Sequence, residues 1–465
     1  MSDKRDSETS QSIASNETEE CDKQGQWSEL PSLPLENIYS FLTRQDQFNM
    51  SMVCRKWSEG YGSPSVWKTF TFDLSASQVS KDNCKVMTFV LKYSRMFRHV
   101  EIDCIQAMKR RLIKSWSRYF IEFLQILTSN SQLQSFKLLY LSSSLTYIGT
   151  PTYKNICRAI ADFLGSQRHL KRVEFDYCSV EFNEGVEFLR KLTENSRESL
   201  THLVLRRFVY RKLSDREQVS NLLQHIPKLS DLPSLKTLET DYSLIFENMV
   251  ASQSNGIQTI KSCKTRVLSK IILHYCHINP EFRDLRGLTS TDWRFLKILC
   301  PDLQVDLRII TLSETRENVE FLIVPNMPIT RLEYIISDFD EEEGPAVIFD
   351  HLLSCNTNDH LVTLHLEGRR HMQFLSSTFI PFFQACKKLK CLKLFINSST
   401  SGIDLLLKSW QENPPESLEK VTIDVWNIDK NDYPILMNLT SEYVPLLELA
   451  GLNVRVKLHV RRIIS

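Results

Sequence analysis

Cysteine and histidine are the residues of this sequence that could act as nucleophiles or metal ligands. The 465 residues include 12 cysteines and 11 histidines. The cysteines occur singly, without the CxxC pairs that are typical of zinc sites. No cysteine has the recognisable His or Asp partner that would activate a thiol. His274 and His277 lie three residues apart without further ligands. We therefore expect no catalytic residue, no metal site and no cofactor, and keep an enzyme with a catalytic cysteine as the weaker alternative.

The overall charge argues against large anionic partners. Lys and Arg number 57 and Asp and Glu 56, which leaves a formal net charge of +1. Such a balance creates no field that would draw the chain onto nucleic acid or a membrane. The sequence also lacks an apolar signal segment and the roughly 18 uninterrupted apolar residues that would span a bilayer. We expect reduced thiols and a cytoplasmic location, with the nucleus as a second compartment.

Two charged runs interrupt this balance. Lys109, Arg110 and Arg111, with Lys114, are interpreted as an exposed helix face, and a nuclear signal or a phosphate contact is the alternative. The acidic run 338–343, DFDEEE, is interpreted as a solvated loop, although it could attract a basic segment of a partner.

The composition changes near Trp27. Residues 1–26 are rich in Ser, Glu, Asp, Gln and Thr and contain one large aliphatic residue, Ile13, so we expect a disordered tail. Residues 27–72 show apolar positions at helical spacing and predict three short helices. The first covers 34–42, the second has Asp46 as its N-cap and carries Val53 and Trp57, and the third begins at Ser63 and Pro64.

The motif in this segment resembles the F-box. Its residues are Leu30-Pro31, Ile38 to Leu42, Asp46, Val53 to Trp57, and Trp67; Leu33 and Pro34 depart from the usual pattern. The resemblance implies binding to the Skp1 adaptor and, through Skp1, to a cullin scaffold. The residues expected at that interface are Leu30, Pro31, Leu35, Ile38, Phe41, Leu42, Val53, Trp57 and Trp67.

A second pattern follows, in which three apolar residues are separated by two residues and then by one. This is the strand pattern of a leucine-rich repeat. Its copies are Phe97/Val100/Ile102, Leu133/Phe136/Leu138, Leu170/Val173/Phe175, Leu200/Leu203/Leu205, Leu268/Ile271/Leu273, Ile329/Leu332/Tyr334, Leu361/Leu364/Leu366, Leu389/Leu392/Leu394 and Leu418/Val421/Ile423, with weaker copies at Leu235/Leu238 and near Leu303.

The fold class expected is therefore α/β: a small three-helix module followed by a leucine-rich-repeat solenoid, with short parallel strands inside and helices outside. Cys178, Cys276 and Asn397 follow the third apolar position by three residues, where a short polar side chain can bond neighbouring turns. The solenoid is assigned to 73–430. Residues 431–465 predict a helix and a strand that cap its open end.

The whole arrangement resembles the F-box only group with divergent leucine-rich repeats. That resemblance implies a non-catalytic receptor subunit of an E3 ubiquitin ligase, with an unknown protein substrate bound by the repeats. A non-catalytic scaffold protein acting outside a ligase is the alternative. Residues between the buried leucines are the candidates for substrate contact: Glu174, Arg206, Arg207, Glu239, His274, Glu333, His365 and Lys393.

Overall fold

The structure is a computed structural model, and it describes most of the chain after residue 26. The described residues are 27–73, 85–104, 113–210, 221–251, 267–276, 285–313, 316–338, 346–368, 375–397 and 402–460. The predicted tail 1–26, the basic residues 109–111, the acidic residues 339–343 and His277 lie outside them. Lys114 is described, and it is exposed on a helix.

The N-terminal module is helical, but its helices differ from the prediction. They are η2 (Trp27–Glu29), α1 (Ser32–Phe41), α2 (Arg44–Ser51), α3 (Arg55–Tyr61) and α4 (Pro64–Trp67). The prediction of one helix carrying both Val53 and Trp57 is wrong, because the backbone turns to an extended conformation at Cys54 and α3 starts anew.

The predicted N-cap of α2 is also wrong. Thr43, not Asp46, occupies that position, and its hydroxyl oxygen accepts a hydrogen bond from the Asp46 amide. Asp46 lies in the first turn, where its carboxylate accepts from the same hydroxyl at 2.6 Å. A cap three residues earlier satisfies the free amides of the first turn equally well. The predicted cap at Ser63 before Pro64 is confirmed.

A parallel sheet follows the helical module. Thirteen strands pair in sequence order, each parallel to the next. They are β1 (Thr69–Asp73), β2 (His99–Asp103), β3 (Ser135–Leu139), β4 (Arg172–Asp176), β6 (His202–Arg206), β8 (Thr237–Asp241), β9 (Lys270–Cys276), β10 (Gln304–Ser313), β11 (Ile329–Asp338), β12 (Thr363–Gly368), β13 (Cys391–Asn397), β14 (Lys420–Ile428) and β15 (Asn453–Val460). Two short strands, β5 (Val180–Glu181) and β7 (Val209–Tyr210), pair separately.

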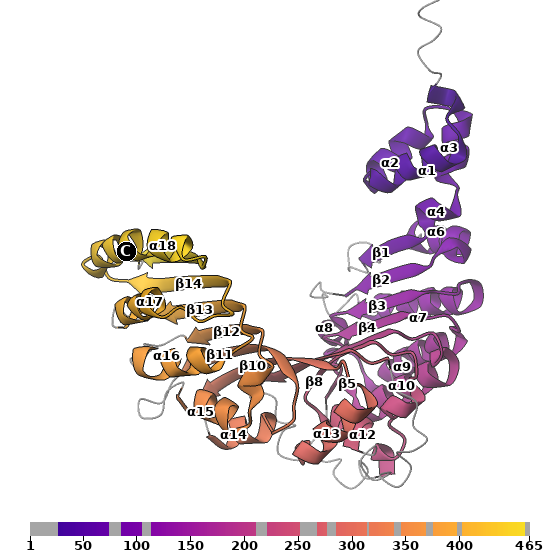
Figure 1. The fold of residues 1–465 in the computed structure, drawn as a ribbon. Helices are drawn as coiled ribbons and strands as arrows, with labels where there is room; N and C mark the ends of the chain where they lie inside the picture. The colour runs from indigo at the N-terminus through magenta and orange to yellow at the C-terminus, as the bar shows by residue number, and fades with distance from the viewer. Residues whose placement is uncertain are drawn as a thin grey trace, which may run out of the picture.

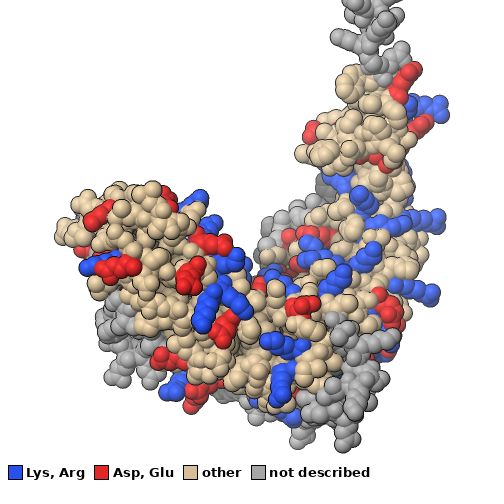
Figure 2. All heavy atoms as spheres, viewed as in Figure 1, with Lys and Arg blue, Asp and Glu red and all other residues tan. Residues whose placement is uncertain are grey.

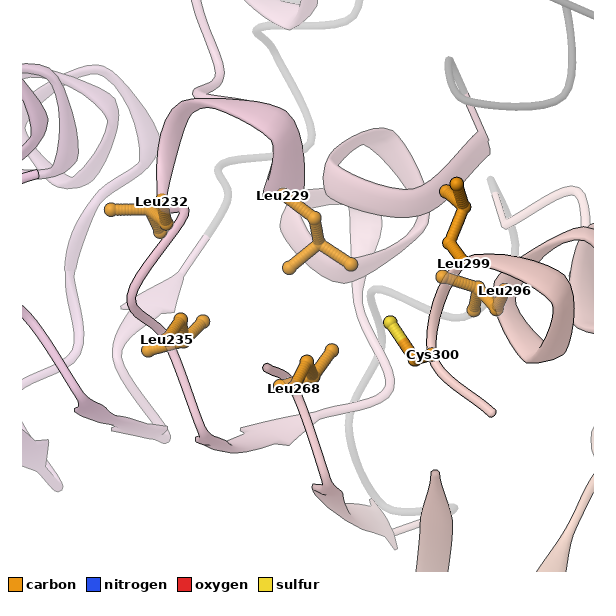
Figure 3. A pocket seen from close by; sticks show the side chains of 7 residues that line it. All are labelled: Leu229, Leu232, Leu235, Leu268, Leu296, Leu299 and Cys300. Carbon is orange, nitrogen blue, oxygen red and sulfur yellow. The ribbon is translucent and has the colours of Figure 1, made fainter. Parts of the chain in front are cut away.

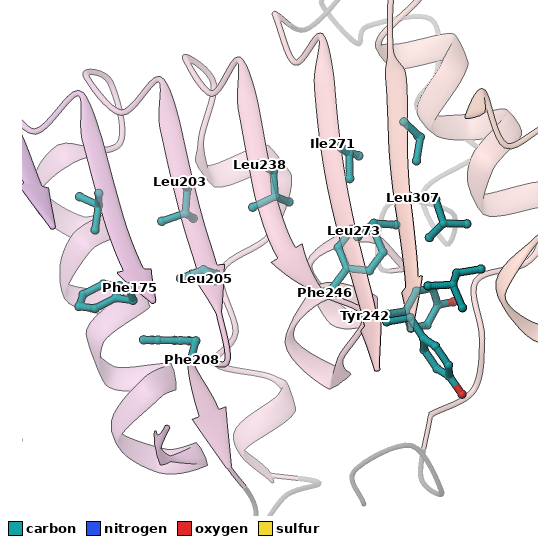
Figure 4. Close-up of a cluster of buried hydrophobic side chains, with 14 of the residues drawn as sticks. Phe175, Leu203, Leu205, Phe208, Leu238, Tyr242, Phe246, Ile271, Leu273 and Leu307 are labelled. Carbon is teal, nitrogen blue, oxygen red and sulfur yellow. The ribbon is translucent and has the colours of Figure 1, made fainter. Parts of the chain in front are cut away.

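The apolar pattern read from the sequence corresponds to these strands. In β3, Phe136 and Leu138 are fully buried, and Leu138 is in register with Phe175 of β4. Figure 4 shows how such side chains line up beneath the middle of the sheet. Alternation along each strand puts every second residue on the opposite face. The pattern thereby separates buried positions from those that can meet a partner. β1 was not predicted, and it joins the end of the helical segment to the sheet.

Helices cover one face of the sheet. They are α6 (Lys85–Tyr93), α7 (Ile113–Asn130), α8 (Leu141–Leu145), α9 (Thr150–Ser166), α10 (Phe182–Ser196), α12 (Leu244–Ala251), α13 (Ser290–Leu299), α14 (Arg316–Leu322), α15 (Ala346–Ser354), α16 (Leu375–Ala385), α17 (Ile403–Glu412) and α18 (Asp432–Leu449), with short 3-10 turns at η3 (Ser94–Met96), η6 (Leu229–Asp231) and η9 (Thr357–Asp359).

The sheet is curved, with its strands on the inner side of an open arc and its helices on the outer side (Figure 1). The helical module stands at one end of the arc, and α18 with β15 at the other. The fold is thus mixed α/β, a helical region followed by a parallel sheet. Its description as a leucine-rich-repeat solenoid with a C-terminal cap stays a prediction.

Candidate functional site

The core of the helical module is organised around Tyr39. Its side chain is fully buried, and its phenol donates a hydrogen bond of 2.6 Å to the backbone carbonyl of Trp57. The amide of buried Gln47 donates to the Tyr39 carbonyl at 2.7 Å. Burial, with the neighbouring phenol of Tyr61, raises the pKa of Tyr39 to about 12. Tyr39 therefore stays a neutral donor that joins α1 to α3. The prediction of site residues missed it, although its spacing of four from Leu35 places both on one helix face.

Trp67 connects this module to the sheet. It is 2% exposed, and its indole N–H donates to the Tyr61 carbonyl at 2.7 Å. Its ring stacks on Tyr93 of α6 with centroids 4.7 Å apart. The Arg44 guanidinium lies 4.8 Å from the Trp67 ring centre and donates to the carbonyls of Val66 and Thr69. Trp67, expected at a partner interface, is thus an interior residue of the joint.

A row of large apolar side chains is exposed on the same module. Phe41 is 84% exposed, Leu33 78% and Val53 65%. Met52 and Phe48 of the α2 region are also exposed. In Figure 2 the module has few charged side chains over α1 and α2. Large apolar side chains exposed on a small module are candidates for contact with a partner. Leu33, Phe48 and Met52 were missing from the predicted interface, because sequence spacing does not show which helix face stays uncovered.

The predicted interface residues fall into three groups. Leu35, with Trp67, lies in the core. Ile38, Leu42 and Trp57 are half-buried and pack against that core, and Leu30 is also half-buried. Pro31, Phe41 and Val53 are exposed. The exposed and half-buried residues can reach a partner directly, whereas Leu35 and Trp67 can act only by supporting them.

Four of the predicted substrate contacts lie together on the inner face of the sheet. Arg206 forms ion pairs with Asp176 and with Glu239, the latter with Nε and Oε1 3.5 Å apart. His274 Nε2 lies 2.9 Å from the same Glu239 oxygen. The hydrogen bond with His274 lowers the pKa of Glu239 below its ordinary value. Glu174 lies on the neighbouring strand β4, and its carboxylate is 3.7 Å from Nζ of Lys137 on β3.

The same arrangement recurs further along the sheet. Arg308 Nε lies 3.5 Å from Glu333, and His365 Nδ1 lies 3.4 Å from the same carboxylate. The hydrogen bond with His365 lowers the pKa of Glu333. Lys393 is in register with His365 and is exposed. The structure thus places five of the candidates in two Arg-Glu-His clusters on one face, with Glu174 and Lys393 on the adjacent strands. Arg207 lies apart from them, with its guanidinium over the Tyr177 ring at 4.7 Å.

Six of the nine described cysteines are buried. Cys178 is buried and its thiol donates to the Leu138 carbonyl at 3.3 Å, which confirms the predicted bond to a neighbouring turn. Burial raises its pKa well above the ordinary value. Cys300 and six leucines line an apolar void of about 10 Å³ (Figure 3), room for at most about one water molecule. Cys178 is therefore poorly suited to nucleophilic attack, since the thiolate is the reactive form.

Among the described residues, no three His, Cys, Asp or Glu side chains are grouped so that they could hold a metal ion. In the same part of the chain, no helix is both long enough and apolar enough to cross a bilayer.

Comparison with known proteins identifies the helical module. The family model of the F-box domain matches residues 27–59. F-box/LRR-repeat protein 21 of Bos taurus is 35% identical over 57 residues, which are 12% of this chain and 13% of that protein. The protein of the same name from Mus musculus is 35% identical over 54 residues, 12% of either chain. These matches span about an eighth of the relatives' length. Residues 27–59 of this chain are therefore an F-box domain with weak similarity to F-box/LRR-repeat proteins.

Proposed function

We propose that this chain is the non-catalytic substrate-recognition subunit of an SCF-type (Skp1-cullin-F-box) E3 ubiquitin ligase. The match of residues 27–59 to the F-box carries this proposal, because an F-box implies binding to Skp1 in such ligases. The cullin would be reached through Skp1. The parallel sheet would hold a target protein, for which Glu174, Arg206, Glu239, His274, Glu333, His365 and Lys393 are the proposed contacts.

The Skp1-binding surface is proposed to combine the predicted residues that are accessible with those that the structure adds. Phe41 and Val53 would be buried on binding, together with Leu33 and Met52 nearby in sequence. Their exposure supports this, since a few large anchors carry most of the free energy of a typical interface. Leu35 and Trp67 would keep the helices in place.

In the proposed mechanism, the chain makes and breaks no covalent bond. A target held on the sheet is kept close to the conjugating enzyme on the same scaffold. Tethering raises the effective concentration of target lysines to about the millimolar range. It also replaces a bimolecular encounter with a nearly unimolecular one.

Co-purification with Skp1 tests the proposal. The variant Phe41→Asp should lose Skp1, because an aspartate cannot be buried without a partner charge. The double variant Leu30→Ala with Pro31→Ala should also weaken the complex with Skp1. Leu449→Asp is the matched control, since Leu449 is 86% exposed at the far end of the arc. Circular dichroism would verify that each variant is folded. Retention of Skp1 by folded Phe41→Asp would contradict the proposed surface.

The alternative is a scaffold protein that uses the sheet for binding outside any ligase. It is favoured if the intact chain never co-purifies with Skp1. Proximity labelling with and without a neddylation inhibitor distinguishes the two further, because partners that are substrates accumulate when the ligase is inactive.

Two finer expectations belong to this proposal. One is a cytoplasmic location, with the nucleus as the second compartment. The other is a particular likeness to F-box only protein 39, based on VCRKW at 53–57, FRHVEI at 97–102, CKKLKCLKLF at 386–395 and LLLKSWQE at 405–412. Imaging of the tagged chain tests the first, and the second stays a prediction.

A further inference from the structure

The inner face of the sheet changes its charge along the arc. On β2 to β4, the described side chains of this face include four acidic and two basic residues: Glu101, Asp103, Glu174 and Asp176 against Lys137 and Arg172. On β11 to β15 the balance is reversed, with five basic and three acidic residues: Arg331, Lys393, Lys420, Arg455 and Lys457 against Glu333, Glu367 and Asp424. The inner face is therefore acidic near the F-box and basic near the C-terminal end.

Two of the basic residues near the C-terminal end lack the ion pairs that are found nearer the F-box. Lys137 lies between two carboxylates, 3.4 Å from Glu101 and 3.7 Å from Glu174. Among the described residues, Lys393 and Arg455 have no carboxylate within ion-pair distance. Both are exposed, and each is in register with Thr422 of the strand between them. Strand spacing puts their backbones roughly 10 Å apart, close enough for one bound segment to reach both.

An aromatic side chain lies on the same face, four residues beyond Thr422 along β14 and in register with Asn397. Trp426 of β14 is 45% exposed, and its ring stacks on His459 of β15 with centroids 3.9 Å apart and planes 13° from parallel. Asp424 lies two residues before Trp426 on β14. Its side chain is 7% exposed, and its Oδ1 lies 3.8 Å from Nζ of Lys457. A fixed, half-exposed tryptophan is a typical anchor of protein interfaces. Figure 2 shows charged side chains of both signs along the hollow between the two ends of the arc.

We propose that the inner face of β13 to β15, with Lys393, Trp426 and Arg455, binds an acidic segment of a partner protein. The unpaired cations supply the charge complementarity and Trp426 the apolar contact. A protein segment fits better than a nucleic acid, because Asp424 lies on β14 within this face. A continuous phosphate backbone would carry negative charge past it, whereas a peptide can present a neutral residue there. The inference rests on the proposed function in one respect, namely that the bound partner would be the ubiquitination target. Binding of the segment itself does not require Skp1.

Peptide binding to the full chain tests this. The probe is a labelled peptide of about twelve residues that alternates Glu and Ser, long enough at about 3.3 Å per residue to cross three strands. Its counterpart replaces Glu with Gln. We expect saturable binding of the Glu peptide in fluorescence anisotropy, weakened between about 50 and 200 mM salt by screening, and no binding of the Gln peptide.

Charge-removing variants locate the site. Lys393→Gln with Arg455→Gln should weaken binding of the Glu peptide roughly three- to tenfold, the range for two lost surface ion pairs. Trp426→Ala should weaken it as well. Lys387→Gln with Lys388→Gln is the matched control, because it removes the same charge from exposed residues in the turn before β13.

Four outcomes would contradict the inference: no saturable binding of the Glu peptide, equal binding of the Gln peptide, an equal loss of binding in the control variant, or tighter binding of a single-stranded RNA of similar length. Failure of the ligase proposal is separable. Phe41→Asp should lose Skp1 and keep the peptide, whereas Lys393→Gln with Arg455→Gln should keep Skp1.

Discussion

The phenol of Tyr39 in α1 donates a hydrogen bond to the backbone carbonyl of Trp57 in α3 across 2.6 Å. The two residues are 18 positions apart, and the contact joins α1, which carries Phe41, to α3, which begins two residues after Val53. The exposed apolar surface of the F-box thus depends on a buried polar contact behind it.

Replacing Tyr39 with Phe should destabilise the module by about 1 kcal/mol, the usual net contribution of one hydrogen bond. Urea unfolding of the purified chain, followed by far-UV circular dichroism, measures the change. Tyr443→Phe on α18 serves as the control, where we expect less than about 0.5 kcal/mol. Equal effects of both substitutions would mean that the buried hydrogen bond contributes nothing.

The raised pKa of Tyr39 predicts a response to alkaline pH. Its folded value of about 12 exceeds the ordinary 10.0, so the folded state holds the proton more tightly than the unfolded state. The stabilisation is complete below pH 10 and is lost as the pH rises toward 12. Unfolding midpoints of the parent chain should decline over this interval, and those of Tyr39→Phe should decline less.

Gly60 allows α3 to approach α1 closely. A Cβ atom at this position would lie 2.6 Å from Cδ2 of Leu35 and 3.3 Å from the Tyr39 ring. Gly60→Ala should therefore cost roughly 1–3 kcal/mol through overpacking. Gly165→Ala in α9 is the comparison, because its Cβ would meet only Lys191 at 3.4 Å. There the helix propensity of alanine should stabilise by up to about 1 kcal/mol. Thermal unfolding distinguishes the two signs.

The two Arg-Glu-His clusters predict acid sensitivity. Hydrogen bonds with His274 and His365 lower the pKa values of Glu239 and Glu333 below 4.5. The unfolded carboxylates therefore bind protons first, so this stabilisation is present above pH 4.5 and is lost as the pH falls through the folded values. Glu239→Gln with Glu333→Gln should flatten the fall in stability below pH 4.5. Glu442→Gln, an exposed site on α18, should leave it unchanged.

Thiol labelling should divide four of the described cysteines into two groups. Burial raises the pKa values of Cys157 and Cys386 to about 12, so almost no thiolate forms there at neutral pH. Cys54 and Cys391 are half-buried. Iodoacetamide at about pH 8 should modify Cys54 and Cys391 before Cys157 and Cys386, which it should reach only after unfolding. Site-resolved mass spectrometry measures this, and rapid labelling of folded Cys157 would refute the assignment.

Much of the architecture is local information and could be read from the sequence. Phe136 and Leu138 predict β3, because alternation between buried and exposed positions has a period of two in any half-buried strand. The segment NICRAIADFLGS predicts most of α9, because its apolar residues recur at spacings of three and four, as on one face of a helix. The segment from Leu30 to Trp57 identifies the F-box, since its residue types and their order form a local motif.

What the tertiary structure decided is which of these residues can be reached. Trp67 and Phe41 are both large and apolar, yet one is 2% and the other 84% exposed. The difference arises because α6, which lies further along the chain, covers Trp67, while the structure leaves Phe41 open. The grouping of Arg206, Glu239 and His274 likewise requires the register of three strands about 35 residues apart. Spacing along one chain determines which residues share a face, but burial and charge pairing depend on packing between distant segments.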